Sequence, residues 1–249
     1  MSAKKAWLTI DDSPSTTTDG KVDVLSERGI VAVWFCLGEN LAARPRSAIH
    51  AIKSGQILGN HGYDHRAFSS LTVDQCRDQI SETDRLIDSI YRDAGTPRPG
   101  KYFRFPYGDK GGLKGTEVLE PYSPEGAARK ADIQRHLAEL GYDKPDWSPI
   151  TYRWFRDAGL ADDLDWYWTY DVMDWSIEEK EPLFGIDSIE RVYDRMEEDV
   201  PEGGRGLHYS GSAEIVLTHD HDGTARFFAP IVDRLSRYVH DYISPLMSP

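Results

Sequence analysis

The chain has 249 residues, of which 39% are hydrophobic and 29% charged, and its formal net charge is −13. The hydrophobic content is enough to bury a core and argues against intrinsic disorder. The acidic balance argues against a nucleic-acid partner, because phosphates are held by clustered lysine and arginine. The two cysteines, Cys36 and Cys76, lack the paired spacing of a disulfide framework or a zinc–thiolate site.

The first residues, MSAKKAWLTIDD, lack the long apolar core of a signal peptide, and no apolar run approaches the length of a membrane span. We therefore expect a cytoplasmic protein with no membrane partner. A secreted chain whose leader has been removed remains the alternative. Nothing in the sequence indicates an oligomeric state.

Short apolar runs alternate with helical patterns along the chain. We expect strands at 6–10, 30–37, 56–60, 101–107, 165–172 and 213–219, and helices at 19–29, 45–54, 72–94, 123–141, 186–199 and 224–242. The clearest helix, 72–94, has Thr72 as a predicted N-cap and Gly95 as a predicted stop. The segment 108–165 is too long for one crossover, and we interpret it as an insertion within a single domain, 1–249.

Alternation of strand and helix is typical of an α/β fold with a parallel sheet or barrel. Polar side chains end the apolar runs at five predicted strand ends. The carboxyl ends of parallel strands meet on one face, which is where barrel enzymes place their active sites. We therefore expect these side chains to form one site.

The first strand ends in two adjacent aspartates, Asp11 and Asp12, within LTIDDSPS. In an extended chain their side chains would point to opposite sides, so one could bind a metal while the other accepts a proton. Solvated turn chemistry is the plain alternative for this stretch. The solvated-turn alternative is less favoured when NHGYDH (60–65) is considered, since His61 and His65 have a spacing that suits one divalent metal.

Three further segments carry candidate residues. Arg104 lies in a run fit for burial and needs a carboxylate partner, for which Asp11 is the candidate; a structural ion pair with another acid is the alternative. His219 could protonate a leaving amine if Asp174 raises its pKa. Trp175 and Leu217 could wall a small apolar pocket or belong to the core. No role is assigned to His221 or Asp222, and His50, His136, His208 and His240 are expected to be surface or packing residues.

Five segments in this order resemble the motifs of the polysaccharide deacetylase family, the NodB-homology domain of carbohydrate esterase family 4. They are TIDDSP (9–14), HGYDH (61–65), RFPY (104–107), DVMDW (171–175) and LTH (217–219). The resemblance spans residue 6 to about residue 240, without the insertion. It implies a distorted (β/α) barrel of about seven strands and a hydrolase of acetylated carbohydrates.

The resemblance also implies roles for single residues. Asp12, His61 and His65 would bind a divalent metal, usually Zn²⁺, with Co²⁺, Ni²⁺ or Mn²⁺ as alternatives. Asp11 would be the general base, oriented by Arg104, and His219 the general acid, tuned by Asp174. The backbone N–H of Tyr107 would hold the oxyanion, and Trp175 and Leu217 would receive the acetyl methyl group.

Two departures from the family pattern bear on the site. Ser13 replaces the usual glycine, and Gly62 replaces a serine or threonine whose hydroxyl would brace the histidine loop. The insertion would lie beside the site and cap it, which argues against an open groove for a polymer.

Removal of an N-acetyl group from a GlcNAc-type sugar is the leading hypothesis. Hydrolysis of an O-acetyl ester, or of an amide or cyclic imide, is the alternative within the same fold. A sugar-binding relative without catalysis is disfavoured, because base, acid and ligands are all present. Two histidines and a carboxylate also suit an iron oxygenase, but that class would be expected on a jelly roll.

Overall fold

The computed structural model describes residues 4–112, 121–199 and 206–246. Its strands are β1 Lys5–Ser13, β2 Ala32–Cys36, β3 Ile57–Asn60, β4 Tyr170–Asp171, β5 Glu214–His219 and β6 Asp241–Tyr242. Its helices are α1 Thr18–Glu27, α2 Gly38–Ala43, α3 Pro45–Lys53, α4 Val73–Ala94, α5 Pro124–Glu139, α6 Arg153–Asp157, α7 Ile189–Met196 and α8 Ala225–Leu235. No helix in the described ranges is both long and apolar enough to span a membrane.

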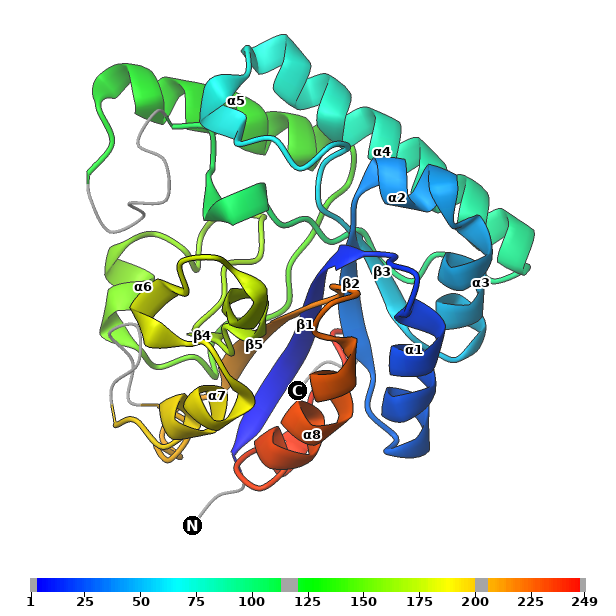
Figure 1. Cartoon of the computed structure of the whole chain (residues 1–249). Coiled ribbons are helices and arrows are strands. Elements are labelled where there is room, and N and C mark those ends of the chain that lie inside the picture. Colours follow the sequence, from blue (N-terminus) through cyan, green and yellow to red (C-terminus); the bar gives the residue numbers. More distant parts are fainter. Residues whose placement is uncertain (1–3, 113–120, 200–205, 247–249) are drawn as a thin grey trace.

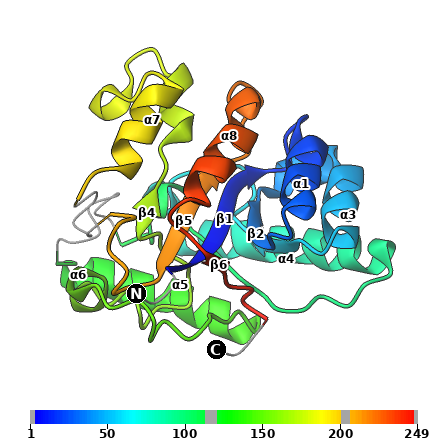
Figure 2. The same ribbon diagram turned by 90° about the horizontal axis from the view of Figure 1, so that it is seen from below.

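The strands form one parallel sheet in the order β3-β2-β1-β5-β4, with β1 at its centre (Figure 1). β6 pairs with the first two residues of β1, ahead of Leu8, where the pairing with β2 begins (Figure 2). The predicted α/β class and parallel sheet are confirmed. The prediction of about seven strands is not met by the described residues, which contain six strands, and their pairing does not show a closed barrel.

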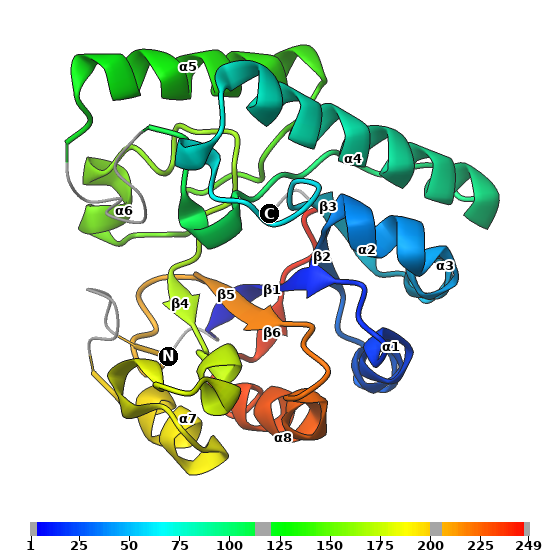
Figure 3. The ribbon, with the colours of Figure 1, turned by 45° about the horizontal axis from the view of Figure 1, so that its top comes forward.

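β1 is buried on both faces because its alternate residues enter two different cores. Leu8 and Ile10 pack in a cluster with residues of α1, α3, α7 and α8, whereas Trp7 packs in a second cluster on the other face. Helices α1, α7 and α8 lie on one side of the sheet in Figure 3. α4 packs beside α5 and also contributes Ile87 and Ile90 to the first cluster, whereas the second cluster includes residues of the segment 147–166. Both faces of β1 are therefore covered, and its carboxyl end carries the aspartate pair.

The described part of the insertion, 108–165, contributes to the second core. Trp147, Ile150 and Phe155 are buried there, and Trp147 makes edge-on ring contacts with Trp7 and Trp166. The aromatic half of the insertion therefore packs in the core. Residues 113–120, also part of the predicted cap, lie outside the described residues.

Three predicted elements were wrong in extent. The segment 101–107 has no strand, only isolated bridges from Phe103 to Asn60 and Asp165, because the chain turns at Pro106, which lacks an N–H. The strand predicted at 165–172 is reduced to β4. The helix predicted at 224–242 ends at Leu235, since the chain then returns to β1 and forms β6.

Candidate metal and catalytic site

The two adjacent aspartates face the same point. Asp11 Oδ2 lies 3.5 Å from His61 Nε2, and Asp12 Oδ1 lies 3.6 Å from the same nitrogen. The prediction that the two side chains point to opposite sides was therefore wrong. Asp12 leaves the extended conformation with a φ of 68°, at a shift in the β1–β2 register, and this turns its carboxylate back toward His61.

His61 and His65 complete a cluster of ligand atoms with Asp12. His65 Nε2 lies 3.2 Å from Asp12 Oδ1, and one atom from each of the three residues lies within 4.8 Å of the others. The side chain of His61 is 2% exposed and that of His65 27%, so the cluster is open on the His65 side. The predicted ligand residues are thus brought together at one edge of the sheet.

The chemistry of this cluster fits a divalent cation. His61 Nδ1 donates a hydrogen bond to the carbonyl oxygen of Arg104 over 2.8 Å, so the Nε2 of the neutral ring carries a lone pair toward the two carboxylates. Asp12 Oδ1 is buried and accepts no well-oriented hydrogen bond in the described structure. Facing lone pairs repel unless a cation lies between them, and two imidazoles with one carboxylate form a typical catalytic zinc set.

Helix α4 braces the histidine loop where the family pattern has a hydroxyl. Gln79 Oε1 accepts hydrogen bonds from the N–H groups of Tyr63 (2.7 Å) and Asp64 (3.2 Å), and the Thr83 hydroxyl donates to the Gly62 carbonyl over 2.9 Å. Gly62 has a φ of +77°, a left-handed conformation in which glycine is favoured. The missing hydroxyl at Gly62 is therefore replaced by side chains from a neighbouring helix.

Arg104 contacts Asp11 as predicted. Its Nη1 lies 2.8 Å from Asp11 Oδ1, and the same nitrogen donates to Thr9 Oγ1 over 2.7 Å. The guanidinium is fully buried and lies over the Phe35 ring, 4.5 Å from its centroid. Because the pair is shielded from water, it holds one oxygen of Asp11 fixed and leaves the other directed at His61.

His219 and Asp174 form the second predicted pair. His219 Nδ1 donates to Asp174 Oδ1 over 3.1 Å, and its backbone N–H donates to Asp174 Oδ2 over 3.1 Å. Burial alone would lower the pKa of His219, but the hydrogen bond and charge of Asp174, with the charges of Asp12 and Asp171, raise it to about 10. His219 is therefore held in its protonated form near neutral pH.

The predicted substrate-side residues lie beside the histidines of the site. The Tyr107 ring is half exposed and lies 4.4 Å, centroid to centroid, from the His65 ring. Trp175 meets His219 edge-on at 6.3 Å, and its Nε1 donates to Asp171 Oδ2. Leu217 is buried two residues before His219 and so shares its face of β5. The roles of Tyr107, Trp175 and Leu217 toward a substrate stay predictions.

Backbone strain is concentrated at the site. Five non-glycine residues in the described structure have a positive φ, and four of them, Asp12, His65, Tyr107 and Met173, belong to or adjoin the predicted motifs. Such conformations cost about 1–3 kcal/mol each and cluster at functional sites. These backbone conformations therefore mark the site independently of its motifs.

His221 is a contact residue that the sequence reasoning left without a role. Its Nε2 donates to Asp12 Oδ2 over 2.8 Å, and its ring lies 5.3 Å from that of His219. The only sequence signal was its spacing of two residues from His219 in LTHDH. By contrast, His50, His136 and His208 contact surface or helix partners, as expected.

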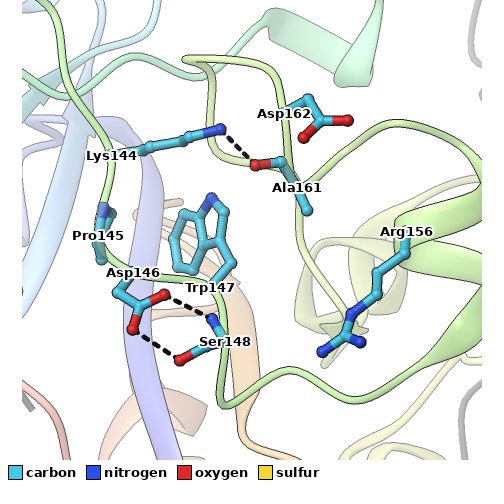
Figure 4. Close-up of a pocket in the computed structure, with 8 residues that line it drawn as sticks. All are labelled: Lys144, Pro145, Asp146, Trp147, Ser148, Arg156, Ala161 and Asp162. Atoms are coloured by element: carbon cyan, nitrogen blue, oxygen red, sulfur yellow. Dashed lines mark hydrogen bonds between the residues drawn. The ribbon is translucent and has the colours of Figure 1, made fainter.

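A separate cavity of about 440 Å³ lies in the insertion (Figure 4). Some of its lining groups bond to one another: Asp146 accepts from the N–H and hydroxyl of Ser148, and Lys144 donates to the Ala161 carbonyl. None of the residues that line it belongs to the predicted motifs. The predicted catalytic residues thus lie at the carboxyl ends of the strands and not in this cavity.

Fold and site together define a class of protein: a parallel α/β protein with an Asp-His-His cluster, a buried Arg–Asp pair and a His–Asp pair at the carboxyl edge of its sheet. Comparison with known proteins supports this class. Residues 1–118 match the family model described as polysaccharide deacetylase. This match covers just under half of the chain, and over these residues the chain resembles the polysaccharide deacetylases of carbohydrate esterase family 4.

Individual relatives show how far the similarity extends. A peptidoglycan-N-acetylglucosamine deacetylase of Bacillus cereus is 32% identical over 103 residues, which cover 41% of this chain and 36% of that protein. The chain thus spans well under two thirds of that relative.

Solved structures with the same fold cover almost the whole chain. A family 4 carbohydrate esterase from Streptomyces lividans, in complex with acetate, has a TM-score of 0.61 at 21% identity and covers 99% of this chain and 97% of its own. A family 4 pseudoenzyme from Bacillus anthracis has a TM-score of 0.60 at 18% identity and covers 95% of this chain and 63% of its own. These likenesses support a distorted barrel of the family type.

Proposed function

We propose that this protein is a metal-dependent hydrolase that removes the N-acetyl group from a GlcNAc-type carbohydrate. The observation that carries the proposal is that a candidate base, Asp11, and a candidate acid, His219, both lie beside the Asp-His-His cluster. Asp11 forms a buried ion pair with Arg104, and the hydrogen bond and charge of Asp174 raise the pKa of His219. A base and an acid held in these states are what amide hydrolysis requires.

Asp12, His61 and His65 would hold the cation, for which Zn²⁺ is the leading candidate because two imidazoles and a carboxylate suit it. When bound there, such a cation would polarise the acetyl carbonyl and make water a stronger nucleophile. Asp11 Oδ2, directed at the cluster, would accept the proton lost by the attacking water. His219 Nε2 would give a proton to the departing amine, since Nδ1 is occupied by Asp174.

The remaining predicted residues would orient the substrate. The N–H of Tyr107 would donate to the oxygen that becomes negatively charged, as oxyanion donors do. Trp175 and Leu217 would enclose the methyl group of the acetyl substituent. Hydrolysis of an O-acetyl ester or of another amide is the second candidate within the same machinery. The strongly basic His219 favours an amide, because an amine leaves only when it is protonated.

The test is acetate release from chitooligosaccharides, peptidoglycan fragments, acetylated xylan and small N-acetylated metabolites, with chelated protein and with Zn²⁺ restored. We expect release from an N-acetylated sugar that depends on the metal. Asp11→Asn should bind Zn²⁺ but lose at least about 10²-fold in activity, whereas Asp12→Ala should lose Zn²⁺ binding. Full activity of the first variant would refute the base assignment, and unchanged metal binding by the second would refute the ligand set. Relatives without activity exist in this fold, so a wild type that binds metal but releases no acetate from any substrate would refute the proposal.

A further inference from the structure

We propose that His221 is a positioning residue for the metal-binding carboxylate: it holds Asp12 through Oδ2, so that Oδ1 alone faces the cation. This inference deepens the proposed function and rests on its metal site. Nothing in the five family-like motifs includes His221, which lies two residues beyond the last of them.

The two aspartates are held in matching ways. Asp11 presents Oδ2 to His61 while its other oxygen accepts from Arg104, and Asp12 presents Oδ1 to His61 and His65 while its other oxygen accepts from His221. Each carboxylate thus has one oxygen held by a donor and one free for the site. His221 thus holds one oxygen of the metal-binding Asp12, as Arg104 holds one oxygen of the base Asp11.

His221 does not lie where a fourth ligand would. The cluster whose donor atoms approach one another within 4.8 Å contains Asp12, His61 and His65 but not His221. Its Nε2 contacts the oxygen of Asp12 that is turned away from the other two histidines. Core packing does not explain its position either, since its side chain is 41% exposed.

A buried network fixes the loop that carries His221. Its carbonyl accepts from Lys21 Nζ over 3.0 Å, and Lys21 is also 2.7 Å from Asp220 Oδ1. Asp220 in turn accepts from the N–H and hydroxyl of Ser15, just after the aspartate pair, and its own N–H donates to the Asp11 carbonyl. The loops after β1 and β5 are therefore tied together, and the distance between His221 and Asp12 is set by buried contacts.

The expected consequence is on metal affinity. Without His221, Asp12 can rotate and lose the orientation of Oδ1, and removal of such a partner typically weakens metal binding about 10–100-fold. The probe is Zn²⁺ alone, titrated into chelator-treated full chain in competition with a chromophoric chelator. His221→Ala should show this loss, whereas His221→Gln, whose amide N–H can still donate to Asp12, should recover part of it.

His208→Ala is the matched control, because His208 is a similarly exposed histidine whose Nε2 contacts a different carboxylate, that of Glu197. It should bind Zn²⁺ like the wild type. The unfolding temperature of all metal-free variants should match the wild type, which separates positioning from a general loss of fold. The d–d absorption of the Co²⁺-substituted protein should change in His221→Ala, since it reports ligand geometry.

The outcomes distinguish this inference from the proposed function. Unchanged Zn²⁺ affinity and Co²⁺ spectrum in His221→Ala would overturn the inference while leaving the deacetylase proposal intact. An affinity loss accompanied by an equal loss in metal-free stability would also overturn it, because the role would then be structural. A wild type that binds no Zn²⁺ would overturn both.

Discussion

Replacement of Arg104 by methionine tests the buried ion pair on which the proposed base depends. Arg104 is fully buried, and its guanidinium donates to Asp11, Thr9 and the carbonyl of Trp166 over 2.7–2.9 Å. Methionine fills much of the volume and can still contact Phe35, so the main loss is the charge. The Asp11 carboxylate, whose side chain is 5% exposed, would then be buried without a cation.

The cost can be worked from this environment. Breaking a buried pair by removing one partner costs about 3–5 kcal/mol, because the remaining charge is neither solvated nor paired. For a chain of this size each kcal/mol lowers the melting temperature by about 2–4 °C, so the expected decrease is about 6–20 °C. Thermal and urea unfolding should be measured with a chelator present, so that bound metal does not compensate for the lost cation.

Two controls make the measurement decisive. Arg153→Met removes an arginine that contacts Asp157 at 3.1 Å on an exposed helix face, and it should leave stability unchanged. In the Arg104→Met background, Asp11→Asn should restore part of the stability, because it removes the stranded charge. If Arg104→Met costs no more than the exposed control, or if Asp11→Asn destabilises it further, the buried pair does not act as described.

Two further predictions concern the acid and the histidine loop. Asp174→Asn removes the partner that raises the pKa of His219 to about 10, so the pKa should move down toward its ordinary value and the alkaline limb of kcat/KM should shift to lower pH in a pH–rate profile. The raised pKa of His219 stabilises the folded protein only below about pH 10. In urea unfolding, Asp174→Asn should therefore lower the free energy of unfolding near neutral pH but have little effect above that pH. An alkaline limb of kcat/KM that does not shift would contradict the assignment of His219 as the acid. Gly62→Ala has room, its nearest neighbour lying 3.4 Å away in the Phe68 ring, but its φ of +77° should cost about 1–2 kcal/mol of unfolding free energy, and a neutral result would contradict the left-handed conformation.

The parts of the fold that the sequence predicted well are those with local signals. α4 begins after Thr72, whose hydroxyl accepts from Gln75 while the Gln75 side chain accepts from the Thr72 N–H, and it ends before Gly95 in a left-handed conformation. Each of these features is decided within one turn of helix. The central strands were also found, because apolar runs on both faces are typical of covered parallel strands.

The elements that were missed depend on distant partners. β6 exists because Asp241 and Tyr242 meet the start of β1, more than 200 residues earlier in the chain. Phe103 forms bridges on both sides without a ladder, since the chain is committed to the turn at Pro106. Neither outcome can be read from a window of neighbouring residues, because hydrogen bonding between remote segments decides it.

The contact of His221 with Asp12 could not be predicted for the same reason, because it joins segments that are remote in the sequence. Family-like motifs predicted the residues that face the cation, but a partner on the far oxygen of Asp12 is visible only when the loops after β1 and β5 are placed together. The contact also depends on the backbone of Asp12, whose positive φ departs from the extended conformation expected from the sequence. A strand-like run gave no reason to expect a left-handed aspartate. Since local rules fail mainly where function imposes another requirement, the strained residues mark this site independently of its motifs.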